Sequence, residues 1–309
     1  MKNKASVLYH YCDITTFCNI IKNRSIWFSD ISKSNDSQEL KWIKGQCKGY
    51  ILKVWVDYLR SVEAEKGDLR TVNFGQFEEL QTVVEDLYNY ETEKCWTFCV
   101  SEKADDLGQW RGYAKDGEGI AIGFTSSFFK SLQKEGKPEI TASNQVAFDK
   151  VLYNEKDVER LFLEMCGLAK INPQMTSEEV IKLLKSAVTA SLLLAPFYKN
   201  PTFAEEKEWR LVFSTITSNL LSGQTPEAAF QKMFPTKAVH YDFVVQNQQF
   251  VSHIEFVDSM MPNNICEIWL GPKCKISSLD LKLFLVSNGY LKDCSDTSIQ
   301  IYKSEASYR

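Results

Sequence analysis

Residues 206–210 form the segment of the sequence that is best equipped for chemistry. The run reads Glu-Lys-Glu-Trp-Arg and is followed by apolar residues. In a β-strand, alternation places Glu206, Glu208 and Arg210 on one face. Two carboxylates on one face repel unless Arg210 or a ligand neutralises them. The run therefore predicts either a catalytic carboxylate, for which we choose Glu208, or a structural Glu–Arg pair on a surface strand.

His10 is the second candidate, and it is one of three histidines in the chain. It lies near the end of a short apolar and aromatic segment beside Tyr11. In a strand, His10 shares a face with Leu8 and Cys12. A histidine here suits the orientation of a ligand, and it equally suits a core position with one hydrogen bond. We expect His10 to face a cleft.

A polar segment with Asn35, Asp36 and Glu39 follows the second expected strand. Asp36 and Glu39 have the spacing of a helix N-cap and its capping box, which is a purely structural explanation. The alternative is a contribution to the site. The loops that follow the first two strands would lie near one another, so we expect these three residues close to His10.

The composition excludes several classes of protein. The 309 residues carry a net charge of −4, and Lys and Arg are scattered among acidic residues, so we do not expect nonspecific binding to duplex DNA. Nine cysteines without a Cys-x-x-Cys pair, and only three histidines, give no zinc spacing. Free thiols, no apolar signal-peptide core and no apolar stretch of membrane-spanning length predict a soluble cytoplasmic protein.

Hydrophobic periodicity predicts an α+β fold. Strands are expected at 7–11, 25–29, 95–100, 119–124, 146–153, 206–213, 239–244, 251–257, 265–270 and 298–302. Helices are expected at 14–22, 39–66, 74–90, 105–114, 156–170, 177–196 and 277–289. Strands and helices do not alternate regularly, so we expect a mixed, largely antiparallel sheet. We expect one domain over 1–309, with helical pairs inserted at about 39–90 and 155–197.

Several motifs, in order, resemble a bacterial family known as domain-of-unknown-function family twenty-nine seventy-one. They are LYHY at 8–11, IWFS at 26–29, NDSQE at 35–39, WRGYA at 110–114, GIAIGF at 119–124, EKEWR at 206–210 and LGPK at 270–273. Two positions differ from the family pattern. Cys12 stands where threonine is usual, and Ser37 stands where proline is usual.

The order of His10 and the Glu206–Glu208 pair is also similar to that of ADP-ribosyltransferases. This resemblance implies an ADP-ribosyltransferase-like fold and NAD as co-substrate, with no metal. Glu208 would then stabilise the oxocarbenium-like state, and His10 would donate to a ribose hydroxyl. The other assignments are stacking of Tyr11 or Trp110 on nicotinamide, a binding role for Glu206, and pairing of Arg210 with pyrophosphate.

The leading hypothesis is thus an ADP-ribosyltransferase-like enzyme, acting as a toxin or phage-defence (antiviral) effector on an unknown macromolecular acceptor. One alternative is a metal-dependent nuclease or phosphoryl-processing enzyme that uses Asp36, Glu39, Glu206 and Glu208 as magnesium ligands. The other is a non-enzymatic sensor or interaction module. In that case the long helices at 39–66 and 177–196 would be partner surfaces.

Overall fold

The computed structural model describes residues 6–33, 39–89, 93–135, 144–216, 223, 225–246 and 248–306. The strands are β1 (Val7–Cys12), β2 (Ser25–Asp30), β3 (Glu93–Ser101), β4 (Ile120–Thr125), β5 (Asn144–Lys150), β6 (Glu208–Ile216), β7 (Ala238–Gln246), β8 (Gln249–Val257), β9 (Ile265–Leu270) and β10 (Gln300–Lys303). The helices are α1 (Ile14–Asn23), α2 (Glu39–Lys66), α3 (Phe74–Asn89), α4 (Leu107–Tyr113), α5 (Ser126–Glu135), α6 (Glu155–Met165), α7 (Ser177–Leu194), α9 (Pro226–Met233) and α10 (Ser278–Ser287).

The ten strands of the described ranges belong to one open sheet. Its order is β10-β9-β4-β1-β3-β2-β8-β7, with β6 added to β3 and β5 added to β6. The pairs are antiparallel except for β9 and β10, which run parallel. The expected α+β class with a largely antiparallel sheet is therefore confirmed.

Strand β3 is the place where the sheet divides. One edge of β3 pairs with β6 over its whole length, from Glu93↔Ile216 to Ser101↔Glu208. On its other edge, β1 pairs with β3 only at Tyr9↔Ser101, whereas β2 pairs with it only at Ser29↔Thr97 and Asp30↔Trp96. The middle of this edge thus faces a gap between β1 and β2.

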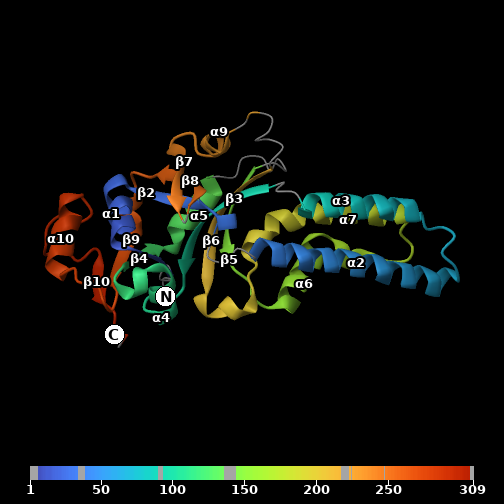
Figure 1. Ribbon diagram of the computed structural model, residues 1–309, viewed down its shortest axis with the longest axis horizontal. Coiled ribbons are helices and arrows are strands. Elements are labelled where there is room, and N and C mark those ends of the chain that lie inside the picture. The colour runs from blue at the N-terminus through green and yellow to red at the C-terminus, as the bar shows by residue number, and fades with distance from the viewer. Residues whose placement is uncertain are drawn as a thin grey trace, which may run out of the picture.

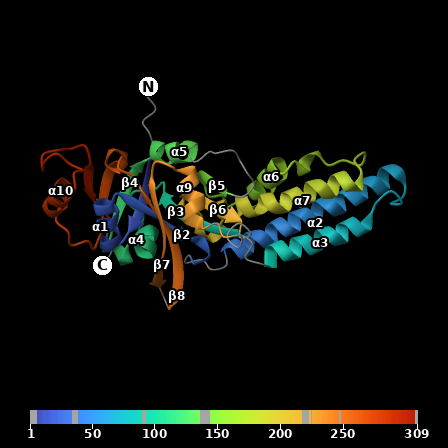
Figure 2. The same cartoon turned by 90° about the horizontal axis from the view of Figure 1, so that it is seen from above.

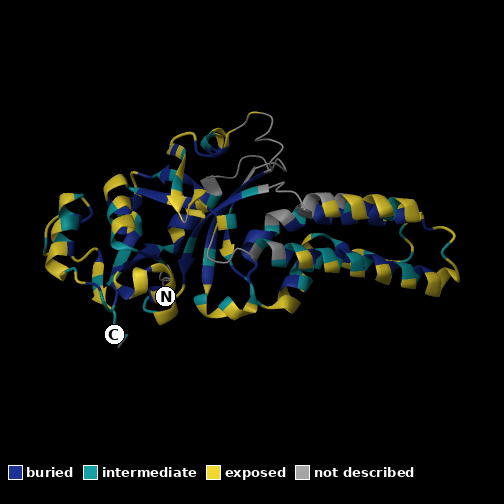
Figure 3. Cartoon of the chain, viewed as in Figure 1, coloured by how far each residue is buried: buried dark blue, intermediate teal, exposed yellow. Residues whose placement is uncertain are grey.

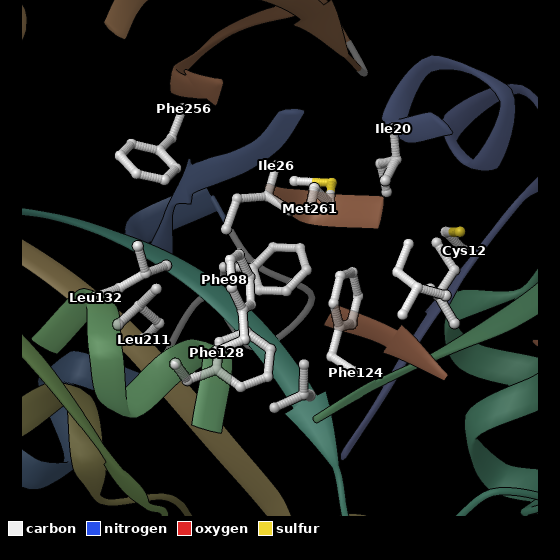
Figure 4. Close-up of a cluster of buried hydrophobic side chains, with 14 of the residues drawn as sticks. Cys12, Ile20, Ile26, Phe98, Phe124, Phe128, Leu132, Leu211, Phe256 and Met261 are labelled. Atoms are coloured by element: carbon white, nitrogen blue, oxygen red, sulfur yellow. The ribbon is translucent and has the colours of Figure 1, made fainter. Parts of the chain in front are cut away.

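One face of the sheet carries the main hydrophobic core. Alternation turns Trp96, Phe98 and Val100 of β3 toward it, and all three are buried. Helices α1, α5, α9 and α10 cover this face with apolar side chains. Figure 4 shows the rings of Phe98, Phe124 and Phe128 gathered at its centre, and the first two rings meet edge to face with centroids 6.0 Å apart.

Helices α2, α3, α6 and α7 form a separate helical unit that extends from one end of the sheet (Figures 1 and 2). The two expected insertions thus pack against each other around their own core. Trp55 of α2 stacks on Phe77 of α3 with ring centroids 4.8 Å apart. Figure 3 shows buried residues on the inner sides of these helices and exposed residues outside, which is the pattern of amphipathic helices.

The boundaries agree with the sequence in most places, and the differences have local causes. Helix α2 begins and ends where periodicity predicted, and the Asp13 carboxylate caps α1 by accepting a 2.6 Å hydrogen bond from the Thr16 amide. The strand expected from 206 begins only at Glu208, because a 3-10 helix occupies Pro201–Glu206. Helices α5 and α9 were not expected at all. None of the helices in the described ranges has the length and apolar character needed to cross a bilayer.

A charged cleft where the sheet divides

A cavity of about 510 Å³ opens at the division of the sheet. Its lining includes His10 of β1, Trp27 of β2, Thr97 of β3 and the pair Glu208 and Arg210 of β6. A side pocket of about 50 Å³ adjoins it, with His10, Tyr11, Tyr113, Glu206 and Glu208 on its walls. The divided sheet therefore gathers the two candidate regions of the sequence, His10 and the 206–210 run, around one space.

His10 is held by a backbone carbonyl that the gap leaves available. Its Nδ1 lies 2.9 Å from the Cys99 carbonyl oxygen, and its ring stacks on Phe98 with centroids 4.3 Å apart. A carbonyl only accepts hydrogen bonds, so Nδ1 carries the proton. Burial lowers the pKa of His10, against the opposing effect of the Cys99 bond, so the ring is neutral. Its Nε2 is then an acceptor, and the expected role as donor to a hydroxyl becomes that of acceptor.

Glu208 and Arg210 form a buried bidentate ion pair on β6. Arg210 donates from Nε to Oε1 at 2.9 Å and from Nη2 to Oε2 at 3.0 Å. Arg210 also donates to the Pro196 carbonyl at 2.6 Å, which fixes the guanidinium. Burial raises the pKa of Glu208, but Arg210 and Lys199 outweigh it and lower that pKa to about 2. Glu208 is therefore ionised at neutral pH.

Lys199 links the two carboxylates. Its Nζ lies 2.6 Å from Oε2 of Glu206 and 3.3 Å from Oε2 of Glu208. Although burial lowers the pKa of Lys199, the nearby Glu208, Tyr113 and Glu206 raise it overall, so the ammonium stays charged. Two carboxylates thus face two cations, which offsets much of the desolvation penalty of the cluster.

Glu206 reaches the cluster from outside the strand. It ends the 3-10 helix, and Lys207 then takes a left-handed conformation with φ 44°. The interpretation that strand alternation alone places Glu206 beside Glu208 is wrong, because the chain turns at Lys207. Tyr113 of α4 donates to Oε1 of Glu206 at 3.0 Å. The Glu206 side chain remains 16% exposed, against 9% for Glu208.

Two aromatic candidates behave differently. Tyr11 lines the cleft, donates to the Lys103 carbonyl at 2.9 Å and accepts from the Asp106 amide at 3.1 Å. Trp110 is fully buried, meets Tyr11 edge-on and donates to Asp105 at 2.6 Å. The expected stacking of Trp110 on a ligand is wrong, because its ring packs in the core behind Tyr11.

The remaining candidates, Asn35 and Asp36, lie outside the described residues. Of Glu39 only the backbone is described, as the first residue of α2. Their expected proximity to His10 stays a prediction. Among the described side chains, no group of three or more His, Cys, Asp and Glu residues is arranged to hold a metal ion.

Several residues around the cleft have no role predicted by the sequence patterns. Lys199 lies outside every motif, and Tyr113 stood in the WRGYA motif without an assigned role; only the fold brings both to Glu206. The phenolic oxygen of Tyr153 accepts a 3.1 Å hydrogen bond from the backbone amide of Glu208. Trp27 stood in the IWFS motif as an aromatic residue of a strand. Strand alternation, which turns Trp27 to the face opposite the apolar Ile26 and Phe28, was the signal that could have identified it.

The fold and this site define an α+β protein with an open, largely antiparallel sheet and a charged cleft at its division. The model of the family described as "Protein of unknown function (DUF2971)" matches residues 109–211, a segment that includes Glu208 and Arg210. The family resemblance carried by the motifs is confirmed over that segment. No curated protein and no solved structure gives a match to the chain.

Proposed function

We propose that the protein is an NAD-dependent enzyme with an ADP-ribosyltransferase-like fold and that the cleft is its active site. The observation that carries the proposal is the meeting of His10 and Glu208 in the wall of the cleft, with Glu206 in the adjoining side pocket. The volume of the cleft, about 510 Å³, lies within the range of small-molecule sites. Ionisable groups that are buried together in a cleft are also typical of active sites.

The proposed chemistry follows from the charges and hydrogen-bonding groups of the cleft. Breakage of the bond between nicotinamide and ribose develops positive charge on the sugar, and the ionised Glu208 stabilises it. The neutral His10 accepts a hydrogen bond from a ribose hydroxyl through Nε2 and orients the sugar. A nucleophilic atom of the acceptor forms a new bond to the ribose carbon that carried nicotinamide. Nicotinamide leaves, and the proton of the acceptor passes to solvent.

The ion pair between Glu208 and Arg210 raises the question of whether Glu208 is catalytic or purely structural. Arg210 bonds to both carboxylate oxygens, and Lys199 adds a contact to one of them. A structural pair has the same appearance, so the choice depends on activity. The proposal assigns Arg210 to the placement of Glu208 at a fixed position in the cleft wall, where rigid support aids a catalytic group.

The deciding experiment compares NAD consumption by the wild type and Glu208→Gln, with the released nicotinamide as the readout. We expect turnover to fall on the order of a hundredfold, because charge stabilisation is a large catalytic effect. Glu102→Gln is the matched control. Glu102 is an ion-paired carboxylate that accepts a hydrogen bond from Trp209, the neighbour of Glu208 on β6. Glu102 does not line the cleft. Full activity in Glu208→Gln, or no NAD consumption by the wild type, contradicts the proposal.

A second experiment uses His10→Ala and calorimetric titration with NAD. We expect weaker binding with little change in melting temperature, because His10 lies at the edge of the gap and is partly exposed. An unchanged dissociation constant would remove His10 from the site.

The two alternatives predict other outcomes. A metal-dependent nuclease requires carboxylates that are free for a divalent ion, but Glu206 and Glu208 are neutralised by Lys199 and Arg210. Nucleic-acid cleavage that EDTA abolishes would favour the nuclease. An interaction module predicts neither activity. The proposed role as a toxin or phage-defence effector predicts that the wild type slows bacterial growth when expressed and that Glu208→Gln does not.

A further inference from the structure

An aromatic pair lies in the cleft on strands β2 and β8. The rings of Trp27 and His253 are stacked, with centroids 3.9 Å apart and planes inclined by 20°. Both residues line the large cavity. His253 is 4% exposed, whereas Trp27 is 38% exposed. A tryptophan is highly buried on average, so an indole held partly open in a cleft offers an apolar plane for a ligand.

The sheet explains why Trp27 is held in this position. Register pairs Trp27 with Glu255 and Ser29 with His253, so both rings stand on the same face of neighbouring strands. Neither ring nitrogen of His253 has a hydrogen-bond partner among the described residues, and Nδ1 is also shielded from solvent. His253 therefore acts as a flat, uncharged support behind the indole. Burial lowers its pKa, against Asp242 and Glu255, which agrees with a neutral ring.

The surroundings of the pair suit a planar heterocycle with a polar edge. Val244 and Val251 add apolar surface to the cleft next to His253. Ser29, which pairs with His253, also lines it, and within the described structure its side chain bonds to no other residue. Apolar planes with a few polar groups beside them are the usual composition of a site that binds an aromatic ring.

The pair is separated from the charged cluster by a distance that fits a dinucleotide. Glu208 pairs with Ser101 at one end of β3, whereas Ser29 pairs with Thr97 and with His253. From strand spacing and rise, the Cα atoms of Trp27 and His253 lie on the order of 12–20 Å from that of Glu208. One ring system cannot contact both places, but two nucleosides joined through phosphates can.

We propose that Trp27, supported by His253, is the adenine-binding subsite of the cleft. The inference rests on the proposed function, which places the nicotinamide ribose between His10 and Glu208. The adenine ring stacks on the exposed part of the indole, and Ser29, two residues along β2 on the same face, bonds to its polar edge. Nothing in the motif pattern assigns a role to His253.

The test is calorimetric titration of the full chain and its variants with NAD, AMP and nicotinamide mononucleotide. Loss of one stacked base contact is worth about 1–3 kcal/mol, so Trp27→Ala should raise the dissociation constants of NAD and AMP by about fivefold to 150-fold. Trp27→Phe should restore most of the affinity. Nicotinamide mononucleotide should bind to Trp27→Ala as it does to the wild type.

Tyr302→Ala is the matched control. Tyr302 is 39% exposed and stacks on Trp269 with centroids 4.6 Å apart, but it lies on β10 and does not line the cleft. It should leave all three affinities unchanged. Circular dichroism of each variant checks that the fold is intact.

The outcomes separate the subsite from the proposed function. Wild-type affinity of Trp27→Ala for NAD and AMP would overturn the subsite and leave the function standing. Trp27-dependent binding of AMP without any NAD consumption would support the subsite and contradict the function. An equal loss for nicotinamide mononucleotide would place nicotinamide on Trp27 and overturn the assignment. Binding of none of the three ligands to the wild type overturns both proposals.

Discussion

The sheet body, which comprises the strands and the helices packed on them, contains a buried cluster of ion pairs that has no counterpart among the described residues of the helical unit. In the helical unit, ion pairs lie at the surface: the side chains of Lys53 and Glu159 are 60% and 28% exposed. In the sheet body, the side chains of Arg210 and Glu208 are only 3% and 9% exposed. Surface pairs contribute little to stability, whereas buried pairs carry a large desolvation penalty that apolar residues would avoid.

This difference identifies the buried ion pairs of the sheet body as groups that stability alone does not require. The helical unit is held together by apolar packing around residues such as Ile51 and Trp55. The sheet body has an ample apolar core on one face and a buried charged cluster on the other. A cluster of this kind beside a cavity is the usual setting of a functional site.

The largest expected effect is the loss of the buried cation. Arg210→Met leaves Glu208 without its bidentate partner, and we expect a loss of about 3–5 kcal/mol in the free energy of unfolding. Lys53→Met, which breaks a surface pair of the helical unit, should cost less than about 1 kcal/mol. Urea denaturation of both variants gives the two numbers. Equal losses of unfolding free energy in the two variants would contradict the difference between buried and surface ion pairs.

A cavity in the helical unit should be costly for stability and neutral for the cleft. Ile51 is fully buried in the core of that unit, and Ile51→Ala should destabilise it by about 2–5 kcal/mol. NAD affinity of the folded variant should stay at the wild-type level, because Ile51 lies in a different core from the cleft. A parallel loss of affinity would show that the two regions act as one.

Acid should weaken the sheet body through Glu208. Arg210 and Lys199 overcome the opposing effect of burial and hold the pKa of Glu208 at about 2, below its ordinary value of 4.5. A depressed carboxylate pKa stabilises the fold above the unfolded value, and this stability is lost as pH falls toward the folded value. We expect about 3 kcal/mol of pH-dependent stability between about pH 5 and pH 2.

The readout is the free energy of unfolding of the wild type and of Glu208→Gln across that range. The variant should lack this part of the acid dependence. If its profile matches that of the wild type, other carboxyl groups cause the acid sensitivity.

A small effect is expected at the helix caps, where the two regions should behave alike. Thr176 caps α7 of the helical unit in a full capping box, and Ser277 caps α10 of the sheet body by accepting from the Asp280 amide at 3.0 Å. Replacement of either by alanine should cost about 1 kcal/mol in thermal or urea unfolding. A much larger loss at one cap would mean that it also holds tertiary contacts.

The sequence by itself determined most of the local structure. Helical periodicity fixed the bounds of α2, and strand alternation placed Leu211 and Phe213 in the core behind Glu208 and Arg210. These patterns act over a few residues, so they survive in any tertiary context that buries their apolar faces. Helix α5 also had a local signal, since Phe128, Phe129 and Leu132 share helical spacing and are all buried.

Only the tertiary structure decided how the site is assembled. The division of the sheet depends on which residues of β1 and β2 pair with β3, and a register is set by partners far along the chain. That register left the Cys99 carbonyl to His10 and made the imidazole an acceptor. Other long-range contacts placed Lys199 between Glu206 and Glu208 and buried Trp110. The pairing of β2 with β8 brought Trp27 to His253. Such contacts arise from long-range packing, and short patterns in the sequence do not encode them.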